Sequence, residues 1–167
     1  MKRIGLISDT HSYLDPAIFK HLKECDEIWH AGDIGNLETA DRLAQIAPLI
    51  AVHGNVDGQE LRVIYPKHQR FKCEEVDVWI THIGGYPKRY DSNVKPEIFE
   101  NTPQLFISGH SHILKVVFDK ELNLLHINPG ASGLEGFHKV QTLVKFVIEA
   151  KEIKDLQVVE FGKKSNR

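Results

Sequence analysis

Residues 4–11 read Ile-Gly-Leu-Ile-Ser-Asp-Thr-His, an apolar run followed directly by polar side chains. Branched side chains without polar alternation predict a strand that is buried on both faces. The run leads into Asp9 and His11, which share one face of an extended chain and are residue types that bind metal ions. The segment therefore indicates a buried sheet with polar chemistry at the end of a strand.

Two further apolar runs repeat this pattern. Ile28–Ala31 leads into Gly32-Asp33, and Leu49–Val52 leads into His53-Gly54-Asn55. Helical segments separate the strands: Asp15-Pro16 is a helix-start signal, and an amphipathic helix is predicted over Glu38–Ala47. Strands that alternate with helices favour right-handed βαβ units and a mainly parallel first half.

The second half of the chain has a different pattern, with hairpin signals and only one short helix, over Pro96–Glu100. We therefore expect this half to be antiparallel. The predicted architecture is two mixed sheets packed face to face with helices outside, and with the strand-end loops gathered at one edge. The strands expected here are Phe71–Val76, Asp77–Thr81, Leu105–Ile107, Leu114–Phe118, Leu122–Ile127, Thr142–Ile148 and Leu156–Phe161.

Length and composition narrow the class of protein. A chain of 167 residues with 41% hydrophobic and 26% charged residues predicts a single globular domain over residues 1–167. The formal net charge of −2 argues against a broad nucleic-acid-binding surface. Cys25 and Cys73 fit no disulfide or zinc pattern, and no run approaches the roughly 20 apolar residues of a membrane span. We therefore expect a cytoplasmic protein without membrane association.

Polar side chains of metal-ligand type follow five of the predicted strands. They combine carboxylates and imidazoles, which suit Mn, Fe, Zn, Ni or Co, whereas Mg prefers mostly oxygen ligands. They are too many for one ion, but two ions that share a bridging carboxylate would use them all, as in the two-metal sites of phosphatases and nucleases. The candidate ligands are Asp9, His11, Asp33, Asn55, His82, His110 and His112.

Each of these short patterns also has a simpler interpretation. An aspartate after a strand can cap a helix, and Gly-Asp or Gly-Asn can form a turn. His30, His53 and His126 are interpreted as core residues, with a role beside the metal ligands as the alternative. Ser111 has no assigned role. The occurrence of all the patterns in order, each directly after an apolar run, favours the metal site.

The ordered motif set resembles that of the calcineurin-like metallophosphoesterases, and within them the small bacterial and archaeal phosphodiesterase branch. The resemblance covers Lys2–Gly130 and implies the four-layer α/β/β/α sandwich known as the metallo-dependent phosphatase fold. The residues that carry it are Asp9-x-His11, Gly32-Asp33, Gly54-Asn55-x-Asp57, His82 and Gly109-His110-Ser111-His112.

The resemblance also implies a role for each ligand. Two divalent transition-metal ions are expected, with manganese first and Fe, Ni, Zn or Co as alternatives, and Asp33 would bridge them. One position departs from the wider family, and one departs from the small branch. Val56 replaces a histidine that acts as a general acid, and no arginine follows the loop at 128–132. The first ion would be held by Asp9, His11, Asp33 and His112, and the second by Asp33, Asn55, His82 and His110.

The expected reaction is hydrolysis of a phosphodiester by a hydroxide that bridges the two metals, with a small phosphoester as substrate. Asn55 would also contact a phosphoryl oxygen, and Asp57, His53 or a metal-bound water would protonate the leaving group. Alternatives are a phosphomonoesterase or nucleotide pyrophosphatase that uses the same site, or a protein-binding scaffold like the retromer subunit that resembles this fold. A homo-oligomer is also an open alternative.

Overall fold

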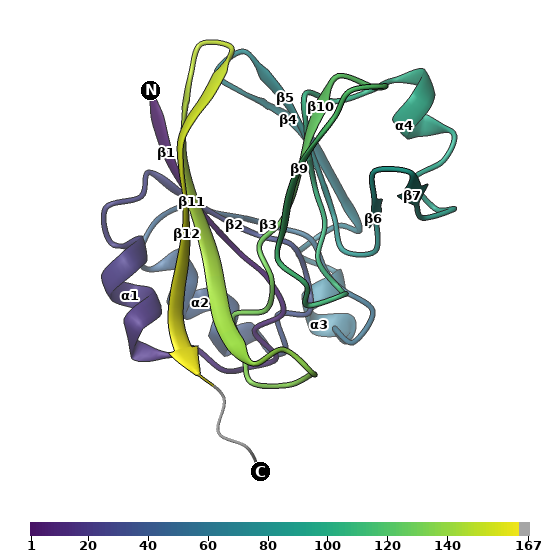
Figure 1. Cartoon of the computed structure of the whole chain (residues 1–167). Helices are drawn as coiled ribbons and strands as arrows, with labels where there is room; N and C mark the ends of the chain where they lie inside the picture. The colour runs from purple at the N-terminus through teal and green to yellow at the C-terminus, as the bar shows by residue number, and fades with distance from the viewer. Residues whose placement is uncertain (164–167) are drawn as a thin grey trace.

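Two five-stranded sheets pack face to face in the computed structural model, which describes residues 1–163 (Figure 1). The first sheet has the order β12-β11-β1-β2-β3, and the second has the order β4-β5-β8-β10-β9. The strands of the first sheet are β1 (Lys2–Ile7), β2 (Glu27–His30), β3 (Leu49–Ala51), β11 (Val140–Glu149) and β12 (Glu152–Lys163). Those of the second are β4 (His68–Cys73), β5 (Val76–Thr81), β8 (Leu105–Ile107), β9 (Lys115–Asp119) and β10 (Leu124–Asn128).

Both sheets are mixed, as the sequence predicts. The prediction that the second half of the chain is antiparallel is wrong. β8 lies parallel to both β5 and β10. The chain crosses over outside the sheet between β5 and β8, and between β8 and β10 it first forms the edge strand β9, which pairs antiparallel with β10. The crossover from β5 to β8 contains the small hairpin of β6 (Gly85–Tyr86) and β7 (Arg89–Tyr90) and the helix α4 (Glu97–Glu100). The C-terminal hairpin joins the first sheet, where β11 pairs antiparallel with β1.

Several predicted boundaries also move. The tight turn predicted near Val76 lies at Glu74-Glu75, and β4 begins at His68 instead of Phe71. The loop predicted over 149–155 is only the turn at Ala150-Lys151. Polar and charged side chains dominate both misplaced stretches. In an edge hairpin such residues remain in the strand because backbone pairing needs no apolar side chain on the solvent face.

Helices cover the sheets unequally (Figure 1). α1 (Pro16–Leu22) and α2 (Leu37–Ala44) bury one apolar stripe each against the outer face of the first sheet. The Asp15 carboxylate accepts the Ala17 N–H at 2.9 Å and begins α1 where the sequence predicts. The outer layer of the second sheet is only α4 and its neighbouring loop, packed on Trp79 and Phe106.

The main core fills the space between the sheets. Trp29 and Phe146 from the first sheet lie among Val78, Leu105 and Ile107 from the second, and all are at most 2% exposed. Large side chains of this kind contribute about 1.5–3 kcal/mol each on burial. The core therefore fixes the two sheets relative to each other, and with them the loops at their ends.

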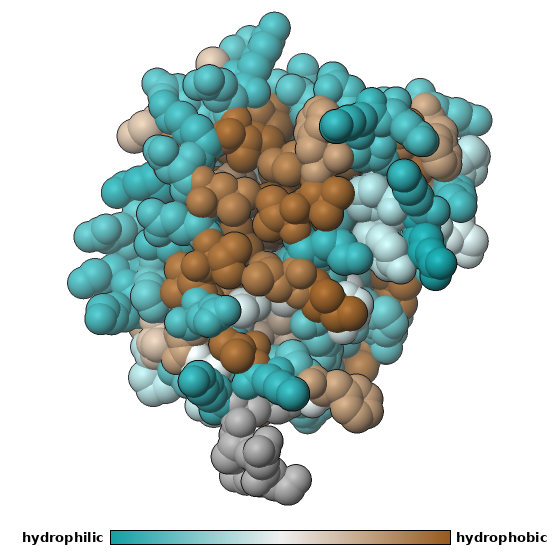
Figure 2. Space-filling model, in the orientation of Figure 1, coloured by the Kyte–Doolittle hydropathy of each residue, from teal (hydrophilic) through white to brown (hydrophobic). Residues whose placement is uncertain are grey.

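The open edge between the sheets is apolar. β12 and β9 are the outermost strands of their sheets on the same side of the molecule, and Figure 2 shows an apolar area between them. Val116, Phe118 and Val158 on these two strands are 38–53% exposed. No helix among residues 1–163 has the length and apolar character needed to span a bilayer.

We expect His126→Gln to weaken the pH dependence of stability. His126 is buried on β10 and donates from Nδ1 to the Phe106 carbonyl, and burial lowers its pKa to about 4. Between pH 6.5 and 4 the unfolded chain therefore binds more protons at this position than the folded chain. The stability contributed by neutral His126 is complete above pH 6.5 and is lost as the pH falls toward 4.

Glutamine keeps an N–H donor for the Phe106 carbonyl but does not titrate. Urea unfolding of the chelator-treated proteins at pH 7 and pH 4.5 gives the comparison. The wild type should lose about 2 kcal/mol more than His126→Gln over this interval. Equal losses in both proteins would contradict the prediction.

Candidate metal centre

The predicted ligands meet at one edge of the two sheets, in two clusters. Asp9, His11 and His112 form the first cluster, and Asp33, His82 and His110 form the second. Within each cluster the candidate ligand atoms lie within 4.8 Å of one another. The parallel strands β1, β2, β5 and β8 end at this edge, and each is followed by one or two of these residues.

Asp33 lies between the two clusters. Its Oδ2 is 3.2 Å from Nε2 of His82 and 3.7 Å from Nε2 of His11. Its Oδ1 faces the other way and accepts the Val56 N–H at 3.0 Å. One oxygen is thus used to fix the carboxylate, and the other points to imidazoles of both clusters.

Asp9 is oriented in the same manner. Its Oδ2 accepts the Ser8 hydroxyl at 2.6 Å and the His110 N–H at 3.2 Å. Its Oδ1 lies 3.2 Å from Nε2 of His112 and 3.8 Å from Nε2 of His82. Ser8 is a functional neighbour that the sequence analysis missed, although its position directly before the aspartate in the Ser8-Asp9 pair was a usable signal.

Buried polar atoms without partners converge on the centre. Asp9 Oδ1, His11 Nε2 and His82 Nε2 are buried and form no hydrogen bond with any of residues 1–163. Buried polar groups are normally paired, because an unpaired one costs about 1–3 kcal/mol. Carboxylate and imidazole atoms left unpaired at one point fit divalent transition-metal ions as their missing partners.

The remaining ring nitrogens are fixed by other groups. His82 donates from Nδ1 to the Ala31 carbonyl at 2.7 Å, which leaves Nε2 unprotonated in the neutral ring. His110 donates from Nδ1 to Oδ1 of Asn55 at 3.1 Å, which brings Asn55 to the second cluster. Metal-binding histidines commonly donate their other N–H in this way, and the bond sets the tautomer.

The charges in the centre shift one another's pKa values. Burial raises the pKa of Asp9, but the nearby His112 imidazole, the charge of His82 and the Ser8 hydroxyl together lower it below the usual value. At Asp33 burial is likewise outweighed by His82, and the pKa is lowered to about 2. His82 has a raised pKa because these two carboxylates outweigh its burial. Both carboxylates are therefore ionised at neutral pH.

The backbone at the centre is unusual. Asp9, His11, Asp33, His110 and His112 all have positive φ, between 46° and 70°. Aspartate and histidine enter this left-handed region more readily than most residues, yet such values remain uncommon. The turns aim successive side chains from each strand end at one point, and backbone strain of this kind concentrates at functional sites.

Two glycines permit the close approach of the strand-end loops. A Cβ at Gly54 would lie 2.1 Å from Oδ1 of Asp33, and one at Gly109 would lie 2.3 Å from Oγ of Ser8. Neither glycine has a positive φ, so space rather than turn geometry requires it. This explains the Gly54-Asn55 pair, for which a turn was the alternative interpretation, and the Gly109-His110 pair.

Asp57 holds two loops together. It is 2% exposed, and its two oxygens accept the backbone N–H groups of Ile34, Gly35 and Gly54 at 2.8–3.1 Å. Arg62 of α3 (Gln59–Arg62) adds bonds to the carbonyls of Asp57 and Asn55. Neither α3 nor the role of Arg62 was predicted from the sequence, since only the folded loop reveals these carbonyls.

Hydrogen bonds fix the positions of the other residues that the sequence analysis singled out near the centre. His30 is buried, donates from Nε2 to Thr10 and accepts the Gly32 N–H at Nδ1, and burial lowers its pKa to about 4. Ser111 Oγ accepts from the Ile113 N–H and from the side chain of Asn128, so it stabilises the His110–His112 loop. His53 donates from Nδ1 to the Tyr65 carbonyl and lies half-buried at a cavity beside the second cluster.

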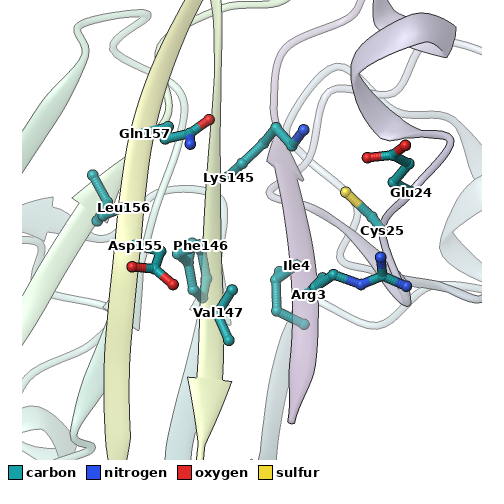
Figure 3. A pocket seen from close by; sticks show the side chains of 10 residues that line it. All are labelled: Arg3, Ile4, Glu24, Cys25, Lys145, Phe146, Val147, Asp155, Leu156 and Gln157. Atoms are coloured by element: carbon teal, nitrogen blue, oxygen red, sulfur yellow. The ribbon is translucent and has the colours of Figure 1, made fainter.

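Two cavities lie beside the centre, and a third lies away from it. One of about 430 Å³ is lined by His53, Asn55 and His82, and one of about 150 Å³ by Gly109, His110 and Asn128; both also include Ile83. A third, of about 530 Å³, lies on the outer side of β1, β11 and β12 and contains no cluster residue (Figure 3). The first two cavities therefore adjoin the candidate metal centre.

We expect Asp57→Asn to lower the free energy of unfolding of the metal-free protein by about 2–4 kcal/mol. An amide offers one acceptor oxygen where three N–H groups need partners, and it turns a donor toward at least one of them. Chelator-treated protein is unfolded in urea to measure the loss. Glu60→Gln, at an exposed position three residues away, serves as the control and should be neutral. A loss below about 0.5 kcal/mol in Asp57→Asn would contradict the stabilising role of the Asp57 hydrogen bonds.

Comparison with known proteins agrees with this geometry. A probable metallophosphoesterase of Methanothermobacter thermautotrophicus is 31% identical over 134 residues, which cover 77% of this chain and 76% of the relative. A probable metallophosphoesterase of Methanocaldococcus jannaschii is also 31% identical, over 77% of this chain and 67% of its own length.

Solved structures share the fold. A structure titled as a novel archaeal phosphodiesterase has a TM-score of 0.75 at 21% identity, over 95% of this chain and 99% of that one. Vps29 of Chaetomium thermophilum has a TM-score of 0.75 at 15% identity, over 98% and 100% of the two chains. At these identities the likeness concerns the fold alone.

A family model described as the calcineurin-like phosphoesterase superfamily domain matches residues 1–151, nine-tenths of the sequence. The two mixed sheets and the paired clusters of carboxylate and imidazole at their edge are consistent with that match. The chain therefore belongs to the calcineurin-like phosphoesterase superfamily, a family of metal-dependent phosphoester hydrolases.

Proposed function

We propose that this protein hydrolyses phosphodiesters with two divalent transition-metal ions bound at the two clusters. The carrying observation is the position of Asp33 Oδ2, which lies within 3.7 Å of an imidazole nitrogen from each cluster. A carboxylate oxygen at that point is suited to bridge two ions. Asp9, His11 and His112 would complete the first position, and His82, His110 and Asn55 the second.

Two divalent ions bound at these positions would supply a water of lowered pKa and would neutralise charge on phosphoryl oxygens. The protein contributes a fixed arrangement. Ser8, Val56 and Ala31 hold the outer atoms of Asp9, Asp33 and His82, so that the ligand atoms need little reorganisation. Asn55 is exposed at the second cluster, where its amide can also donate to a phosphoryl oxygen.

The two cavities beside the centre favour a diester over a monoester. Ile83 lines both of them, and their volumes are about 430 and 150 Å³. A phosphodiester carries an alcohol on each side of phosphorus, and each cavity can accept one. A phosphomonoesterase or nucleotide pyrophosphatase acting on the same ligands is the second candidate, and the Vps29 structures are compatible with a protein-binding scaffold without favouring it.

The residues beside the centre also narrow the choice of proton donor. Asp57 has both oxygens occupied by backbone N–H groups, which suits a positioning role. His53 lines the larger cavity beside Asn55 and His82, and its Nδ1–H is held by Tyr65. When protonated, its Nε2 can donate to an alkoxide that departs into this cavity. We therefore place the proton donor at His53.

Asp33→Asn should abolish most metal binding and activity. The amide removes the negative charge shared by both clusters. It has a single oxygen, and if that oxygen accepts the Val56 N–H, as Oδ1 does in the wild type, no oxygen faces the two clusters. Metal content is measured by elemental analysis after purification without chelator, and turnover of bis(p-nitrophenyl) phosphate is measured with added Mn²⁺. We expect a loss of at least a hundredfold in kcat/KM, about 3 kcal/mol of transition-state stabilisation.

Asp41→Asn, at an exposed position on α2, is the matched control and should keep both metal and activity. Wild-type turnover in Asp33→Asn would refute the bridging role. A side-by-side screen of monoesters, diesters and dinucleotides on the wild type tests the substrate class. Faster turnover of monoesters than of diesters would replace the proposal by its second candidate.

His53→Ala should slow the hydrolysis of diesters with poor leaving groups much more than that of nitrophenyl diesters. A nitrophenolate departs without protonation, whereas an alkoxide needs a proton at departure. We expect a drop of about tenfold to a hundredfold in kcat for an alkyl diester and a small change for bis(p-nitrophenyl) phosphate. His68→Ala on β4 is the control. Equal effects on both substrates would exclude His53 as the donor.

A further inference from the structure

The larger cavity beside the second cluster has a mostly polar lining. The cavity is formed by residues between β3 and β4, by the end of β5 with its following loop, and by the segment before α4. The lining residues are His53, Gly54, Asn55, Arg62, Lys67, Thr81, His82, Ile83, Asp91 and Asn93. Asn55 and His82 also belong to the candidate metal centre, so a group bound here would lie next to a phosphate held at that centre.

Asn93 presents an unpaired acceptor. Its Nδ2 donates to the Ile83 carbonyl and to Oδ1 of Asp91, which uses both amide hydrogens and fixes the orientation of the side chain. Its Oδ1 is buried and forms no hydrogen bond with any residue in the range 1–163. A buried acceptor without a partner favours a ligand that brings a donor.

Asp91 adds a second acceptor beside it. Its Oδ1 accepts the backbone N–H of Asn93 at 2.9 Å as well as the amide, and these bonds leave Oδ2 available. The two side chains therefore hold each other in place. Both residues line the cavity, so acceptor oxygens gather at this part of it.

The same cavity is also lined by two basic residues. Arg62 is committed to backbone carbonyls of the loop that bears Asn55, and it positions that loop. Lys67 is exposed at the rim, and its carbonyl accepts the Thr81 hydroxyl at 3.3 Å. Its ammonium is free to rotate and can donate to an acceptor in the cavity.

Acceptors and donors that line one cavity match hydroxyl groups, each of which both donates and accepts. An anionic group would face Asp91. A flat aromatic group would find no Phe, Tyr or Trp among the lining residues. The volume of about 430 Å³ suits a small polyol or sugar, whereas the neighbouring cavity of about 150 Å³ holds a much smaller group.

We propose that this cavity binds a polyhydroxylated alcohol, of glycerol or sugar type, as the leaving arm of an asymmetric phosphodiester, with Asn93 and Asp91 accepting its hydroxyl protons. The proposal rests on the phosphodiesterase function proposed above. It makes Asn93 and Asp91 specificity residues and Lys67 a donor at the rim, with His53 beside the oxygen of the departing alcohol.

The test compares two diesters, methyl glycerol phosphate and methyl 1-propyl phosphate, which differ only in two hydroxyls on one arm. The ratio of their kcat/KM values is measured by 31P NMR for the wild type and for Asp91→Asn, so that the intrinsic difference in leaving-group reactivity cancels. Asparagine keeps the oxygen that holds Asn93 but replaces the free acceptor by a donor. We expect the preference for the glycerol diester to fall about tenfold, chiefly through KM.

Three further measurements complete the test. Asn93→Leu should reduce the ratio similarly if it folds, Lys67→Gln should reduce it about threefold, and Asp41→Asn should leave it unchanged. The Asp91→Asn variant must be folded and must still turn over bis(p-nitrophenyl) phosphate. If its ratio is then unchanged, the inference is overturned, whereas the proposed phosphodiesterase function is not affected. A wild-type preference for a diester with an anionic arm would overturn it as well. Absence of any diesterase activity in the wild type would instead refute the proposed function.

Discussion

Two buried carboxylates that face the same small space impose the main constraint on this structure. Asp9 Oδ1 and Asp33 Oδ2 both lie within 3.9 Å of His11 Nε2, and both carboxylates have lowered pKa values. Like charges at this range repel strongly unless positive charge lies between them. Imidazoles supply part of that charge, and the unpaired atoms indicate where divalent ions would supply the remainder.

The rest of the edge serves to hold these two carboxylates. Ser8 and Val56 fix their outer oxygens, Asp57 and Arg62 tie the neighbouring loops through backbone groups, and Asn128 supports the His110–His112 loop. Such bonds offset the cost of the left-handed turns at the strand ends. The same loops form the walls of the adjoining cavity, so the residues that order the centre also shape the space next to it.

The sequence was informative about the strands and less so about their pairing. Apolar runs that end in Asp9, Asp33 and His82 located three strand ends, because burial on both faces leaves a plain compositional signal. The direction of β8 and the start of β4 could not be predicted. Parallel pairing depends on the path of the crossover, and a charged edge strand such as β4 looks like a loop.

The sequence by itself determined which chemistry is present: an ordered set of carboxylates and imidazoles, each directly after a strand, and the family to which that order belongs. Only the tertiary structure decided which atoms face one another. The fold pairs the Asp57 carboxylate with backbone N–H groups of two loops, and it lets the Ser111 hydroxyl accept the Ile113 N–H. It also leaves the buried Oδ1 of Asn93 without a hydrogen-bond partner among residues 1–163. Residue type follows from local pattern, but hydrogen-bond partners come from segments far apart in the chain, and only folding brings them together.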